Sequence, residues 1–432
     1  MRISPPPAST ATLTPSGVST GAAGGVVLSG AVGAAKQARS GRSVSDGRGA
    51  AAPGPGTGGA GPLGTSRTVL HPPHRGRRAD RAALRENLRE VSLLKRLRRC
   101  GHTAVDGQGV MVRCTSTPDG PRAGFAGLAT CGSVWACPVC AAKIAAERSA
   151  ELVRTLEAVQ AQGYRAALMT FTVRHSARHA LRDVWGAVTR GWGRVTSGKG
   201  WKSDQSRYGL GGWARAVEVT HGANGWHVHV HAVVVYRGTV QEGHDLGWSM
   251  WRRWLGGIER AGFTAVAGSG GFDVQVSEGG ELGALGKYLA KQGADLDGLA
   301  AEAVTGQFKQ GRKGNRTPFQ IARDVFTSGD ADDLDLWHEW ERVSKGRRQL
   351  TWSKSLRELA DLEDERTDEE IAADETGTAD DDVVLLPAET WRAVRSTSWL
   401  LLDRVESEGR AGLVAWLDAC GYAWHVPPSQ RQ

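Results

Sequence analysis

The chain has 432 residues and a formal net charge of +8, and its length accommodates two or three domains. The charge is segregated: residues 1–100 hold 16 Lys and Arg against 4 Asp and Glu, whereas residues 361–382 hold 12 Asp and Glu against one Arg. The chain outside this acidic segment is strongly basic, which favours a polyanionic partner, nucleic acid above all. Without a run of about 18 apolar residues, nothing is expected to span a membrane. We expect a cytoplasmic protein with no membrane partner.

The N-terminal residues 1–78 are rich in Gly, Ala, Pro, Ser and Thr. We expect them to form a disordered tail, because they contain too little apolar surface to offset the entropy lost on ordering. After Asp80, apolar residues recur among arginines at steps of three and four, which predicts a basic amphipathic helix ending near Cys100. These residues are Leu84, Leu88, Val91, Leu94 and Leu97.

Five of the six cysteines lie between positions 100 and 140, too few and too clustered for a disulfide scaffold. Cys137 and Cys140 form a C-x-x-C pair with an intervening proline, and Cys131 precedes it; this spacing is typical of structural Zn²⁺. Cys100 is the preferred fourth ligand, with His102 and Cys114 as alternatives. A redox role for the pair is the competing interpretation. Residues 79–150 are therefore expected to hold a basic helix and a zinc region.

The next segment, residues 151–300, has helical and strand patterns in the order β-α-β-β-α-β-α, after a helix that ends at Gly163. This order predicts a ferredoxin-like split β-α-β unit, that is, an α+β domain whose antiparallel sheet carries helices on one face. The expected strands are 164–173, 213–220, 226–236 and 271–277, and the expected helices are 181–195, 246–258 and 278–292.

Residues 301–360 are expected to form a basic helical extension, with Thr317 as an N-cap before Pro318. Its Lys and Arg residues alternate with Phe and Trp, a composition that can serve phosphate binding and base stacking. The acidic residues 361–382 are interpreted as a solvated linker, and 383–432 as a small helical region.

The stretch "NGWHVHVHAVVV" places His227, His229 and His231 on one face of a strand, where imidazoles can converge on a cation. If Thr220 pairs with His227 across the turn, Glu218 lies opposite His229 on the same face. A carboxylate beside histidines favours Mg²⁺ or Mn²⁺. The alternative is a strand whose histidines face water, and a register shift of one residue would move Glu218 to the other face.

A second candidate motif is "KYLAK", in which Tyr288 and Lys291 are neighbours on a helix surface. A tyrosine is a poor nucleophile until a base, a cation or a metal assists it. Lys291 can supply the cation, and Glu281, two turns earlier on about the same face, can activate the phenol or a water.

Three motifs in order, "LMTFTVRH" (168–175), "GWHVHVH" (225–231) and "KYLAK" (287–291), resemble those of rolling-circle plasmid replication initiators of the actinomycete type, within the HUH endonuclease superfamily. The resemblance covers roughly residues 95–360. It implies an HUH nuclease domain that nicks and rejoins one DNA strand at the plasmid's double-strand origin.

The resemblance also implies roles for individual residues. His229 and His231 would be the metal-binding pair, with His227 and Glu218 as further ligands for Mg²⁺ or Mn²⁺. Tyr288 would attack the scissile phosphate and leave a 5′-phosphotyrosyl enzyme and a free 3′-OH. The partners implied are single-stranded or hairpin origin DNA and the host helicase and polymerase. Relatives often carry a glutamate four residues before the tyrosine, where this chain has Ala284.

Three other functions compete with this one. A relaxase or transposase of the same superfamily would use the same chemistry. A noncatalytic zinc-dependent DNA-binding regulator would use Tyr288 and the histidines structurally. A zinc hydrolase would use His227, His229 and His231 without a tyrosyl intermediate.

Overall fold

The computed structural model describes residues 73–277 and 314–430, apart from the single positions 106, 108, 119 and 363. Nearly all of the expected tail 1–78 and the whole of the expected helix 278–292 lie outside these residues. Within the described part, none of the helices combines the length and the apolar character needed to cross a bilayer.

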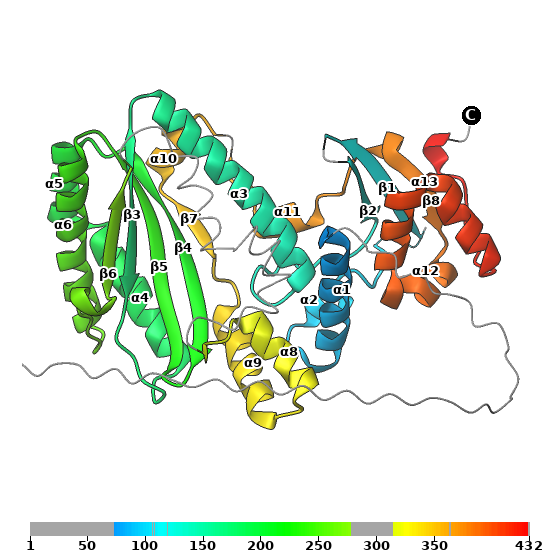
Figure 1. The fold of residues 1–432 in the computed structure, drawn as a ribbon, viewed down its shortest axis with the longest axis horizontal. Coiled ribbons are helices and arrows are strands. Elements are labelled where there is room, and N and C mark those ends of the chain that lie inside the picture. The colour runs from blue at the N-terminus through cyan, green and yellow to red at the C-terminus, as the bar shows by residue number, and fades with distance from the viewer. Residues whose placement is uncertain are drawn as a thin grey trace, which may run out of the picture. The chain divides into compact units, whose positions relative to one another are not determined.

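A five-stranded antiparallel sheet forms the centre of the domain (Figure 1). The four strands expected from the sequence are all present, and they lie next to one another, so the α+β class with an antiparallel sheet is confirmed. A short fifth strand adds an edge that the sequence did not indicate. In spatial order the strands are β6 (Phe272–Val276), β3 (Arg165–Thr172), β5 (Gly225–Tyr236), β4 (Gly212–Gly222) and β7 (Leu350–Trp352).

Two long helices cover one face of this sheet. Both were expected, and their apolar faces meet alternate residues of the strands, such as Phe171 and Val230. Trp254 is fully buried there, and its indole N–H donates to the carbonyl of Thr172 at 3.0 Å. A shorter helix, not expected, follows the first. These helices are α4 (Leu181–Val195), α6 (Val240–Glu259) and α5 (Gly198–Tyr208).

The opposite face of the sheet is also partly covered, so the expectation of helices on a single face is wrong. The long helix α3 (Pro138–Ala161) buries its apolar stripe there, and α10 (Lys354–Leu359) packs beside it. The reason is that α3 presents Leu152, Leu156 and Val159 to Ala166, Leu168, Val233 and Val235 of the strands. The part of this face toward the β4–β5 turn carries the alternating histidines.

The basic helix expected to run as far as Cys100 is broken into α1 (Pro73–Val91) and α2 (Lys95–Arg99). The break coincides with a buried carboxylate, Glu341, on helix α9 (Ala331–Ser344). The Leu93 backbone N–H donates to this carboxylate at 2.8 Å, and so does the Ser92 hydroxyl. A contact with a residue some 250 positions away in sequence therefore ends the helix.

We expect Glu341→Ala to lower the free energy of unfolding by about 2 kcal/mol, because the buried donors of Ser92 and Leu93 would lose their acceptor. Glu341→Gln keeps one carbonyl oxygen as an acceptor and should lose less. Denaturant unfolding of the three proteins gives the comparison. A Glu341→Ala variant as stable as the wild type would contradict this account of the break.

The helical extension has the expected start. Thr317 caps α8 (Pro318–Thr327) in a reciprocal capping box with Gln320. Arg316, one of the basic residues of this extension, pairs with Asp324 at 2.9 Å and Asp333 at 2.6 Å.

The C-terminal region is not purely helical, because its strand β8 joins β1 and β2 in a second sheet of order β2-β1-β8. A separate apolar core lies between this sheet and two helices. The elements are β1 (Val110–Thr117), β2 (Gly120–Ala126), β8 (Asp382–Leu386), α12 (Ala388–Val394) and α13 (Trp399–Ala419). Short 3₁₀ turns lie at Ala267–Ser269, Ala379–Asp381, Arg395–Thr397 and Pro428–Gln430.

The acidic segment 361–382 is not a solvated linker. It contains helix α11 (Asp368–Ala373), which buries Ile371 against the main core. Its carboxylates pair with arginines of other elements: Asp368 with Arg148 at 3.2 Å, Glu365 with Arg348 at 2.9 Å and Asp382 with Arg113 at 2.6 Å. The charge run is ordered because it meets cations supplied elsewhere in the chain.

Candidate functional site

The β4–β5 hairpin has the register expected from the sequence. Thr220 pairs with His227, Glu218 with His229 and Ala216 with His231. Pairing continues to a two-residue turn before Gly225, whose φ of +78° suits glycine. Glu218 therefore lies on the histidine face of the sheet.

Glu218, His229 and His231 form a compact group, here called the cation group. The Glu218 Oε2 atom lies 3.0 Å from His229 Nε2 and 3.2 Å from His231 Nε2, and the candidate ligand atoms all lie within 4.8 Å of one another. Adjacent ligands of an octahedral ion bound at about 2.1 Å lie about 3.0 Å apart. The three side chains therefore fit a metal ion of this kind.

The surroundings of the cation group favour the tautomer and protonation states that a metal ion needs. His231 Nδ1 lies 3.0 Å from the Thr170 hydroxyl on β3, which can accept the Nδ1–H and leave the Nε2 lone pair toward Glu218. Burial lowers the pKa of His231 and so favours its neutral form. Burial alone would raise the pKa of Glu218, but the attraction of His229 and the hydrogen bond from His229 hold it below its usual value.

His227 lies beside the cation group but has a different partner. Its Nδ1 is 2.9 Å from His175 Nε2, and His175 Nδ1 is 2.9 Å from the Asn224 carbonyl. Since the carbonyl only accepts, His175 donates from Nδ1 and accepts from His227, whose Nε2 then keeps a lone pair. Burial lowers the pKa of His227 to about 4, so this imidazole is neutral.

His175 was not identified as a site residue from the sequence. It is the last residue of "LMTFTVRH", and its position at the end of that motif is the signal that could have pointed to it. Tyr288, Lys291 and Glu281 lie outside the described residues, and their roles remain predictions.

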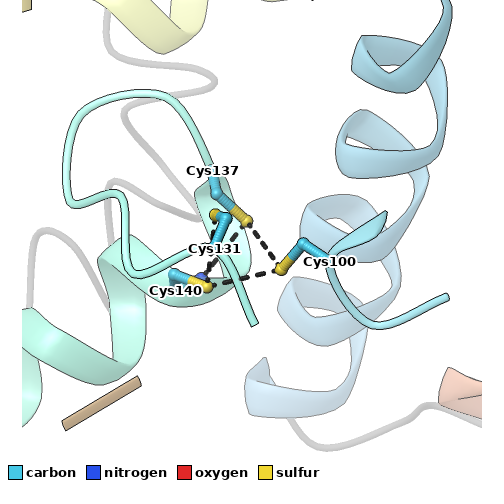
Figure 2. A group of neighbouring side chains, drawn as sticks. All are labelled: Cys100, Cys131, Cys137 and Cys140. Carbon is cyan, nitrogen blue, oxygen red and sulfur yellow. Dashed lines mark hydrogen bonds between the residues drawn. The ribbon is translucent and has the colours of Figure 1, made fainter. Parts of the chain in front are cut away.

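A second group consists of four cysteine thiols, shown in Figure 2. Cys100 Sγ lies 3.5 Å from Cys140 Sγ and 3.8 Å from Cys137 Sγ, and Cys131 Sγ lies 3.7 Å from Cys140 Sγ. Four sulfurs bound at about 2.3 Å around a tetrahedral ion lie about 3.8 Å apart. The thiols thus fit a structural Zn²⁺, and each residue is at most 5% exposed.

The four thiols come from three places in the chain. Cys100 follows α2, Cys131 lies in a loop, and Cys137 caps α3 by accepting the backbone N–H of Cys140. The alternative ligands His102 and Cys114 are not part of the group.

Arg85 on α1 is next to these thiols. Burial lowers its pKa, but the negative charges of Cys137 and Cys100 outweigh this and raise it. Its guanidinium can thus offset the negative charge of a zinc–thiolate centre.

Residues 126–255 match the family model described as "Replication protein". The matched range includes the three residues of the cation group and three of the four clustered cysteines. Cys100 and Tyr288 lie outside it.

Two relatives of the chain come from Streptomyces. "Protein rep" of Streptomyces lividans is 28% identical over 354 residues, which cover 66% of this chain and 76% of that protein. "Neomycin resistance protein" of Streptomyces cyanogenus is 34% identical over 140 residues, covering 27% of this chain and 32% of that protein. No solved structure matches the chain. The resemblance to plasmid replication initiators of the actinomycete type is confirmed.

Proposed function

We propose that this protein starts rolling-circle replication by nicking one strand of the plasmid's double-strand origin in the cytoplasm and joining itself to the cut end. The observation that carries the proposal is the convergence of Glu218, His229 and His231 on one face of a sheet, inside the region that matches replication proteins. The sequence adds Tyr288 as the nucleophile. The free 3′-OH would then be extended by the host polymerase, with a host helicase opening the duplex.

The reaction is a transesterification. The Tyr288 oxygen forms a bond to the scissile phosphorus, the bond from phosphorus to the 3′ oxygen breaks, and the phosphate stays on tyrosine as a 5′-phosphotyrosyl ester. The phenol proton leaves to Glu281 or a water, and the departing 3′ oxygen takes up a proton. Bound Mg²⁺ or Mn²⁺ would polarise the phosphate and stabilise its developing charge.

The residues around the cation group have supporting roles in this scheme. Thr170 holds His231 in the tautomer that offers Nε2, and Glu218 supplies the negative charge that a divalent ion needs. His227, fixed by His175, presents a lone pair next to the group and can accept a hydrogen bond from a bound water.

The test is a covalent adduct. Wild-type protein incubated with Mn²⁺ and a single-stranded origin oligonucleotide should form a protein–DNA species that survives denaturing electrophoresis. Tyr288→Phe should form none, because phenylalanine lacks the attacking oxygen, whereas the matched variant Tyr164→Phe should react like the wild type.

The competing functions give other results. Tight binding without any adduct would favour a noncatalytic regulator, and cleavage without an adduct would favour a hydrolase. An adduct that persists in Tyr288→Phe would show that another residue is the nucleophile.

A further inference from the structure

A cavity of about 870 Å³ lies between helices α1 and α3, strand β2 and the start of α13. Figure 1 shows α1 and α3 side by side, and α1 also contacts α13. None of the residues that line the cavity belongs to the cation group or to the zinc-site cysteines. Neither the proposed nicking chemistry nor zinc binding accounts for it.

The cavity is strongly basic. Six cations line it, and none of the described residues in its lining is acidic. Arg154 on α3 has a side chain that is 61% exposed and forms a long ion pair with Glu147 at 4.0 Å. Arg78 is held in place by Asp403 and Glu406. The cations are Arg78, Arg81, Arg85, Arg122, Lys143 and Arg154.

One wall of the cavity carries small apolar side chains. Ala142, Ala146, Ala150 and Val153 follow one another on α3 at helical spacing, and Ala146 and Ala150 are exposed. Aromatic side chains, including Trp399, contribute to the lining as well. An apolar wall next to arginines can contact bases and phosphates at the same time.

We propose that this cavity binds a segment of single-stranded DNA, with the phosphates on the arginines and the bases against the apolar wall. Single-stranded DNA fits better than duplex DNA, because a duplex presents mainly phosphates and stacks its bases inside, which would leave the apolar wall uncovered. The inference rests on the proposed function, since unwinding and nicking at an origin produce such a strand. The cavity thus acts as a second DNA contact, separate from the nicking site.

The test is binding of a fluorescent oligothymidylate, without origin sequence, to the full-length zinc-loaded protein in buffer without added Mg²⁺ or Mn²⁺, measured by anisotropy at several salt concentrations. The double variant Arg122→Glu/Arg154→Glu reverses two exposed charges of the cavity. It should weaken binding about tenfold and reduce the steepness of the salt dependence by about 0.7 for each phosphate that the variant no longer neutralises. The matched variant Arg190→Glu/Arg194→Glu, with two exposed charges on α4, should bind like the wild type.

A second variant tests the apolar wall without changing any arginine. Ala150→Glu places a carboxylate on the exposed apolar wall and should weaken binding in the same way without disturbing the helix. Equal binding by the wild type and both cavity variants would overturn the proposal. So would a wild type that prefers duplex thymidylate–adenylate to the single strand. Because the assay needs no nicking, a wild type that binds but forms no adduct with origin DNA would refute the proposed function and leave this inference standing.

Discussion

Replacing Cys137 with serine is expected to release zinc from the protein and to destabilise it by at least about 3 kcal/mol, since the free energy of binding a structural zinc ion is part of the free energy of folding. Cys137 is completely buried and lies in contact with Cys100 and Cys140. The centre joins the end of α2 to the start of α3. Its loss therefore separates the N-terminal helices from the helix that covers the second face of the sheet.

The measurement combines the zinc content of purified protein with thermal unfolding. Cys114→Ser is the matched control, because Cys114 is half-buried on β1 and outside the thiol group, so its variant should keep one zinc per chain. A wild type purified without zinc, or a Cys137→Ser variant with full zinc and unchanged stability, would contradict the assignment.

The second large effect is expected at the cation group. His231→Ala should abolish measurable Mn²⁺ binding at this group and reduce adduct formation with origin DNA by about 10³-fold, as expected when charge stabilisation at the phosphate is removed. Thr170→Val keeps the imidazole but removes its hydroxyl partner, and should weaken Mn²⁺ binding about 10- to 100-fold. Omitting Mg²⁺ and Mn²⁺ from the buffer should stop the wild-type reaction, and added Mn²⁺ should restore it.

Mn²⁺ binding is followed by electron paramagnetic resonance, which does not depend on activity, after the structural zinc content has been checked. His244→Ala, on α6 and outside the cation group, serves as the histidine control. If His231→Ala bound Mn²⁺ as tightly as the wild type, the cation would have to be held by other residues.

The cation group could be predicted from the sequence because it depends on local rules. Side chains alternate between the two faces of a strand, which places the histidines on one face. The tight turn sets the pairing that brings Glu218 opposite His229. The pairing of His227 with His175 could not be predicted, because it depends on where β3 ends relative to the hairpin.

The features that the sequence did not reveal share one physical cause, which is contact between distant parts of the chain. Strand β8 pairs with β1 across more than 250 positions, and neither has a strong alternating pattern of its own. The break before α2 depends on Glu341, and the order of the acidic segment depends on arginines such as Arg148. Composition describes such segments correctly as charged but does not show what they meet.

The two-residue turn of the β4–β5 hairpin also limits how the gene can change. Inserting one codon between Glu218 and the turn would rotate the glutamate to the face occupied by Val217 and Val219, placing a carboxylate in an apolar core and removing it from the histidines. Inserting two codons would restore the original face. Insertions between Glu218 and the turn should therefore be tolerated only in multiples of two residues. Substitutions at the same positions do not move Glu218 to the other face and are not limited in this way.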